Sequence, residues 1–135
     1  MTKAEQLEAL ALRCKQATGP DRRLDAEIDC LVRFTDLRPA ELDDHKKYQR
    51  GVPPGAGDIW CPTGFLMAAS YTASLDAALT LVPADHDWVV GNVNGHVGGT
   101  PYACVGSRDQ HFAATPALAL CAASLRARAA AERGM

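Results

Sequence analysis

Three predicted helix starts carry small polar residues, and this pattern favours the binding of an anion. The starts lie at 19–21, 71–74 and 115–116. Free backbone N–H groups and the helix dipole at such ends can hold a phosphate, and a nearby guanidinium can complete the charge. Ordinary helix capping is the simpler explanation of each start taken separately, because every helix needs it. The candidate ligand-binding residues are Arg22, Arg23, Tyr71, Thr72, Ser74 and Arg126.

Metal binding is a second chemistry that the residue types allow. The available ligands are His45, His86, His96, His111, Cys61, Asp85 and Asp87. No pair of histidines has the spacing of a helical or knuckle metal site, and the side chains of residues 85–87 would alternate across a strand. We interpret these side chains as exposed turn residues and predict neither a metal nor another cofactor.

Catalytic signatures are missing from the sequence. It contains no phosphate-binding P-loop, GxGxxG, HExxH or GxSxG pattern. We therefore predict a non-enzymatic protein and name no catalytic residue, while an unrecognised hydrolase or transferase stays open as an alternative.

Composition narrows the class of protein further. The chain has 135 residues, 47% of them hydrophobic and 22% charged, with a formal charge of −2. These values predict one globular domain over 1–135 and disfavour a nucleic-acid polymer as partner. No apolar run reaches the ~18 residues of a membrane span. Five widely spaced cysteines without a CxxC pair argue against a disulfide framework, so we expect a cytoplasmic protein.

Two amphipathic helices are predicted in the first part of the chain. Thr2 and Glu5 have capping-box spacing before an apolar stripe, which predicts a helix over 3–17. A second helix follows the 19–21 break. Its apolar stripe is Leu24, Ile28, Leu31 and Val32, and its charged face of Arg22, Asp25, Asp29 and Arg33 is interpreted as solvated.

The segment 36–70 lacks a clear period. It is rich in proline and glycine, and we predict either an irregular functional insertion or a segment that contains short helices near 40–48 and 65–69.

The second half alternates helix and strand signals. A helix capped by Thr72 is predicted before Pro83, and strands are predicted over 86–93, 102–105 and 110–113, with a hairpin turn at Asn94-Gly95. Trp88 and Phe112 are expected in the core because large aromatics supply burial area. The final helix, from Thr115-Pro116 to about 132, has the clearest start in the chain.

Several strings resemble the small phage proteins described as having a phage ABA sandwich domain. They lie at 18–28, 71–83, Trp88 and 114–128. The resemblance covers roughly 7–34 and 70–130. It implies a phage or prophage origin in a bacterial host and an α+β fold in which a small antiparallel sheet of about three strands lies between helical layers. It transfers no activity and no catalytic residue.

Two functions follow from these observations as hypotheses. The first is a phage accessory protein that binds and sequesters a small anionic, nucleotide-like ligand, such as a cyclic nucleotide or ADP-ribose-type immune signal of the host, and that acts as a homo-oligomer. The second is an interaction module that binds a host or phage protein through 36–70. The apolar anchors of that module would be Val52, Ile59, Trp60, Phe65, Leu66 and Met67, although these can equally form its own core.

Overall fold

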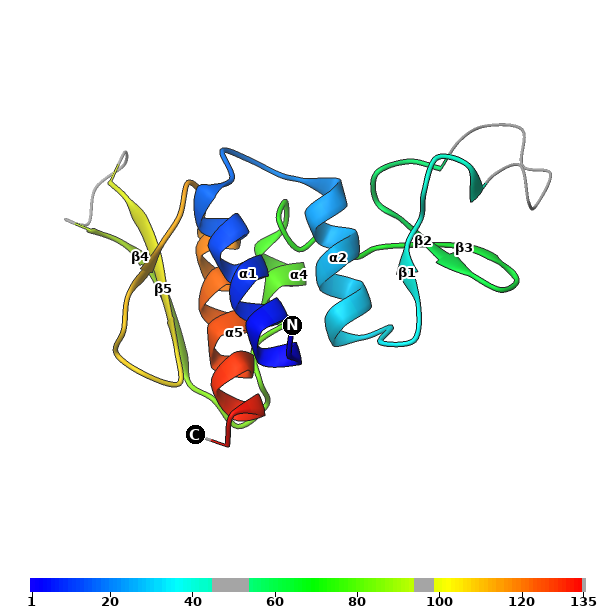
Figure 1. Ribbon diagram of the computed structural model, residues 1–135. Coiled ribbons are helices and arrows are strands. Elements are labelled where there is room, and N and C mark those ends of the chain that lie inside the picture. The colour runs from blue at the N-terminus through cyan, green and yellow to red at the C-terminus, as the bar shows by residue number, and fades with distance from the viewer. Residues whose placement is uncertain (45–53, 94–98, 135) are drawn as a thin grey trace. The chain divides into compact units, whose positions relative to one another are not determined.

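The computed structural model describes residues 1–44, 54–93 and 99–134, which form two compact units (Figure 1). The major unit comprises residues 1–21 and 70–135, and the minor unit comprises 22–69. The class is α+β, as predicted, but the described residues carry two three-stranded antiparallel sheets rather than one. No helix among them is long and apolar enough to cross a membrane.

Two packed helices form the centre of the major unit. Helix α1 (Lys3–Gln16) begins with the predicted capping box, in which Thr2 Oγ1 accepts from Glu5 N at 3.1 Å. Helix α5 (Pro116–Glu132) begins at the predicted Thr115 cap. Their shared core is apolar and includes Leu7, Ala11, Cys14, Leu118, Cys121 and Leu125. Both helices are confirmed, and the two helical cysteines are buried as free thiols.

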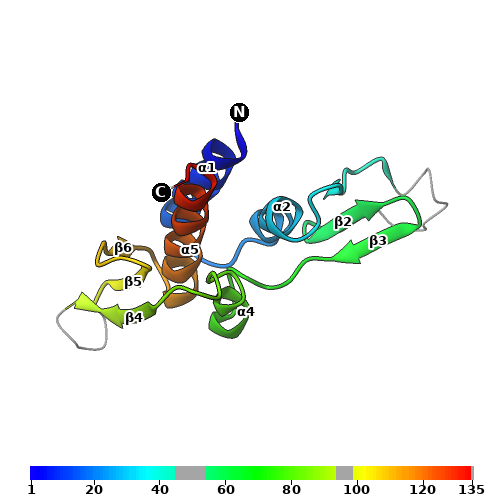
Figure 2. The ribbon, with the colours of Figure 1, turned by 90° about the horizontal axis from the view of Figure 1, so that it is seen from below.

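A sheet covers another side of α5. Strands β4 (Trp88–Asn92), β5 (Pro101–Val105) and β6 (His111–Phe112) run antiparallel in that order. Ala103 and Val105 are buried in β5, which packs on α5, so the layers of this unit run sheet, α5, α1 (Figures 1 and 2). The predicted strands are confirmed, whereas the Asn94-Gly95 turn lies outside the described residues.

The outer face of this sheet carries exposed apolar side chains. Alternation along the strands places Val89, Tyr102 and Phe112 together on that face. Val89 is 53% exposed and Phe112 is 40% exposed, and Trp88 at the strand end is 46% exposed. The prediction that Trp88 and Phe112 anchor the core is therefore wrong, because the buried face of the sheet is filled by small residues against α5.

The short helix α4 (Leu75–Leu79) starts later than predicted. Ser74 is its cap, with Oγ accepting from Ala77 N at 3.2 Å. Thr72 is buried instead, and its Oγ1 accepts from Asp21 N at 2.8 Å. Thr72 therefore joins two chain segments of the major unit rather than capping a helix.

The minor unit holds the remaining helix and sheet. Helix α2 (Arg22–Val32) packs on strands β1 (Arg38–Pro39) and β2 (Asp58–Cys61), and β3 (Gly64–Met67) pairs with β2. The short helix predicted near 65–69 is wrong, because most of that stretch lies in β3, whose hairpin turn uses the positive φ of Gly64. Of the helix predicted near 40–48, residues 45–48 lie outside the described residues, and residues 40–43 form no helix. Ile59 is fully buried at the centre of the core, beside Ala26 and Ala68.

The polar face of α2 is buried at two positions, contrary to the predicted solvated surface. Asp25 and Asp29 have no exposed area. Asp29 accepts two hydrogen bonds from Arg33, at 2.9 and 2.8 Å, and a third from the backbone N of Ala69 at 3.0 Å. Buried carboxylates need such partners. These bonds fasten the end of the 36–70 segment to α2, and so the compact unit begins at Arg22 rather than at residue 36.

Candidate functional site

A pocket of about 390 Å³ lies in the major unit beside the second half of α5. We call it the basic pocket. Arg126 and Arg133 come from α5, His111 from β6, and His86 and Ser107 from the segments that precede β4 and follow β5. Glu8 and Asp109 are its acidic residues.

The two arginines of the basic pocket differ in how their charge is compensated. Arg133 Nη2 donates to Glu8 Oε2 at 3.0 Å, and the Arg133 guanidinium holds the pKa of Glu8 below its usual value. Arg126 is exposed, and no carboxylate or other acceptor in the described part of the chain bonds to it. Arg126 is thus available to an external anion.

Two basic groups, Lys15 and His111, lie close enough to Arg126 to feel its charge. The pKa of His111 lies below its ordinary value of 6.5, first because of burial and then because of the positive charges of Lys15 and Arg126, with Asp109 opposing them. The pKa of Lys15 is also lowered, by burial and then by Arg126. The His111 Nδ1 atom is buried and has no hydrogen-bond partner among the described residues. This corner of the molecule therefore brings the positive charges of Lys15 and Arg126 close to His111, while Glu8 and Asp109 are the acidic groups nearby, and Arg126 helps to lower the pKa of Glu8.

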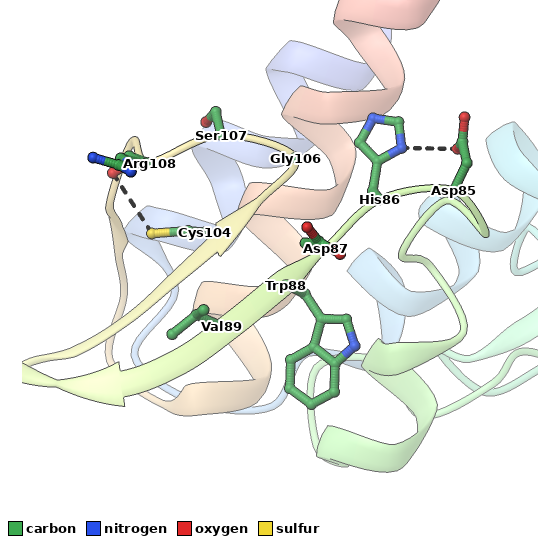
Figure 3. Close-up of a pocket in the computed structure, with 9 residues that line it drawn as sticks. All are labelled: Asp85, His86, Asp87, Trp88, Val89, Cys104, Gly106, Ser107 and Arg108. Carbon is green, nitrogen blue, oxygen red and sulfur yellow. Dashed lines mark hydrogen bonds and ion pairs between the residues drawn. The ribbon is translucent and has the colours of Figure 1, made fainter.

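His86 and Gly106 shape one wall of the pocket. Gly106 has a φ of +69°, and a Cβ there would come within 2.3 Å of the His86 Cδ2 atom. Asp85 Oδ1 lies 2.9 Å from His86 Nδ1, which holds the ring from its other side (Figure 3). Gly106 N also donates to the Asp87 carbonyl at 2.8 Å. A side chain at residue 106 would displace the imidazole and would be strained at this positive φ, so glycine is favoured there.

A second pocket (Figure 3) shares His86, Gly106 and Ser107 with the basic pocket. Its nucleophile candidates are Ser107 and Cys104, but Ser107 Oγ accepts from Asp109 N at 3.2 Å and Cys104 Sγ donates to the Arg108 carbonyl at 3.7 Å. Within the described ranges no hydrogen bond links either of them to His86, and no group of three His, Cys, Asp or Glu side chains could hold a metal. This geometry gives no support to a hydrolytic centre.

The predicted ligand-binding arginines of α2 are used inside the minor unit. Arg22 donates to Asp25 and to the carbonyl of Ala68, both at 2.8 Å. Arg23 donates to the Ala40 carbonyl at 2.8 Å and lines a separate pocket whose charged groups are otherwise acidic. Both guanidiniums serve structural contacts there.

The other predicted residues lie in the major unit, and Arg126 is the one that lines the basic pocket. Tyr71 is only 2% exposed, and its carbonyl accepts from Cys121 Sγ at 3.3 Å. A buried Tyr71 contradicts the expectation that its ring stands ready for a ligand. Thr72 is also buried, and the Ser74 side chain accepts a hydrogen bond as the N-cap of α4.

Sequence reasoning did not assign His86, His111 and Arg133 to an anion site. His111 carried a usable signal, because alternation along the predicted strand 110–113 places it on the face opposite Phe112. No sequence signal indicated that His86 lies against Gly106. That contact depends on the positive φ of Gly106 and on the pairing between strands β4 and β5.

Comparisons with protein-family models, with curated proteins and with solved structures find no match to this chain. The resemblance to the phage ABA sandwich proteins therefore stays a prediction.

Proposed function

We propose that this protein binds a small anionic ligand in the basic pocket and holds it without turning it over. The observation that carries the proposal is the exposed guanidinium of Arg126, which stands beside Lys15 and His111 with no acceptor in the described part of the chain. Like charges held close together are unfavourable, and an anion between them reduces that cost.

The pocket suits a phosphate-bearing small molecule. A guanidinium binds phosphate through two parallel hydrogen bonds, and a volume of about 390 Å³ falls in the usual range for small-molecule sites. Arg133 is already neutralised by Glu8, so Arg126 supplies the charge that selects the ligand.

The ligand class that we propose is nucleotide-like, with a cyclic nucleotide or an ADP-ribose-type immune signal as its first members. The predicted phage origin supports this class, because a phage protein can protect the phage by sequestering an immune signal of its host. Sequestration needs a binding pocket and no catalytic group. On this proposal the protein acts as a sponge in the cytoplasm of the bacterial host.

The test is a thermal-shift screen against inorganic phosphate, nucleotides, cyclic dinucleotides and trinucleotides, and ADP-ribose isomers. A ligand at a hundredfold excess over its Kd stabilises the folded state by about 2.7 kcal/mol. Mass spectrometry of the recovered ligand should find it unchanged. A converted ligand would replace sequestration with catalysis, and a panel without any shift would contradict the binding proposal.

A second candidate function is supported by the surface of the minor unit. Leu42 and Met67 are 73% and 76% exposed, and Leu66 is 38% exposed. Such side chains can anchor a protein partner. Pull-downs with the wild-type chain and with Met67→Lys test this reading, and partners retained equally by both chains would count against it.

A further inference from the structure

The β4 strand forms an open edge of the major-unit sheet. The order β4-β5-β6 leaves β4 paired on one side only. Gly106 N donates to Asp87 O, and Val93 N donates to Thr100 O, so the odd-numbered residues of β4 direct their backbone groups toward β5. The N–H and C=O groups of Trp88, Val90 and Asn92 therefore point away from β5, and no described residue bonds to them.

This edge lacks the features that normally prevent strand addition. Natural edges are protected by charges, proline, bulges or short length. Strand β4 is five residues long, with the sequence WVVGN, and its register with β5 is continuous. The opposite edge, β6, is only two residues long. The unprotected edge of this sheet is thus β4.

The strand is complementary to itself in an antiparallel pairing. If Val90 of one copy faces Val90 of another, then Trp88 faces Asn92 in both directions, and about six backbone hydrogen bonds can form. No charge on β4 opposes this pairing, and Asp87 of each copy stands at opposite ends of the joined strands. The register therefore brings no like charges together.

Side chains on the outer face also fit this register. Val89 of one copy would stand opposite Gly91 of the other. The Tyr102 side chain lies over Gly91, where a Cβ would come within 3.1 Å of the hydroxyl. Val89, which is 53% exposed in one copy, would be covered by that ring in the pair.

We propose that two copies of this chain associate through antiparallel pairing of their β4 strands, which joins two three-stranded sheets into one. The occupant of the edge is thus a second copy of the chain. This inference is independent of the anion proposal, because none of the β4 backbone groups lines the basic pocket.

The test is light scattering of the purified full chain together with that of Val90→Pro. The wild type should have twice the chain mass of 14.4 kDa, and Val90→Pro should have the single mass. Proline at this position removes an outward N–H and leaves the ladder with β5 intact. Phe112→Pro is the matched control, because residue 112 has an outward N–H on the opposite edge, and it should stay dimeric.

Two further readouts keep the inference testable if Val90→Pro fails to fold. Val89→Lys keeps the backbone and adds a charge to the pairing, so it should shift the chain toward the monomer. Amide exchange of the wild type should show protection at Trp88, Val90 and Asn92. A wild-type monomer at high concentration, rapid exchange of these amides, or a folded Val90→Pro that remains a dimer would overturn the proposal.

Discussion

Particular arginines of the two units differ in how their charge is paired. In the minor unit Arg22, Arg33 and Arg38 each bond to an aspartate of the same unit, and Arg38 also lies over the Trp60 ring at 4.8 Å. In the major unit Arg126 has like charges as neighbours and no described acceptor. The presence of an arginine in the sequence is therefore no guide to ligand binding until its acceptors are known.

The largest effect is expected from removing a buried carboxylate of the minor unit. Asp29→Ala leaves Arg33 and the Ala69 N–H without their acceptor, and should lower the free energy of unfolding by about 3 kcal/mol. Denaturant titration measures this change. Asp36→Ala is the control, because Asp36 is exposed and a surface change should stay within about 0.5 kcal/mol. Equal stability of the two variants would show that the Asp29 contacts do not hold the unit together.

The next largest effect is expected at the turn that seats His86. Gly106→Ala adds strain at a positive φ and a contact of 2.3 Å with the imidazole, so it should cost about 2 kcal/mol and lower ligand affinity. Gly134→Ala is the matched control, because its φ is also positive but no atom lies within 4 Å of the added Cβ. A Gly106→Ala melting temperature no lower than that of Gly134→Ala would contradict the proposed wall.

A smaller effect is expected at the start of α5. Thr115→Ala removes the acceptor for Leu118 N and should cost about 1 kcal/mol, whereas Thr115→Ser should keep most of the stability. Thermal unfolding of both variants distinguishes the capping bond from a general effect of substitution.

The sequence predicted well the elements that depend on neighbouring residues, and it predicted poorly those that depend on residues far along the chain. The Thr2 capping box and the Thr115-Pro116 start depend on neighbouring residues, and both are confirmed. Strand β3 was predicted as helix because its conformation depends on pairing with β2. Asp29 was predicted in solvent because its partner at Ala69 is forty residues away. In the candidate site, Arg126 was predicted as a ligand-binding residue. The positions of His86 and His111 beside it depend on strand pairing, which the sequence does not reveal.

The smallest effect is expected from pH. Because the folded-state pKa of His111 is depressed, the unfolded chain takes up a proton first as the pH falls below 6.5. The contribution of neutral His111 to stability is therefore present above that pH and is lost on acidification. Saturating inorganic phosphate should reduce the loss, and His111→Gln should flatten the profile. Urea titrations between pH 5 and pH 8 test this, and a wild-type stability that rises on acidification would have the wrong sign.

The most direct test of the central claim is a calorimetric titration of ADP-ribose and inorganic phosphate into wild type, Arg126→Gln and Arg133→Gln. We expect binding to the wild type, a loss of about tenfold or more in affinity for Arg126→Gln, and a much smaller loss for Arg133→Gln, whose charge is already paired. Equal losses in the two variants, or unchanged binding by Arg126→Gln, would contradict that claim.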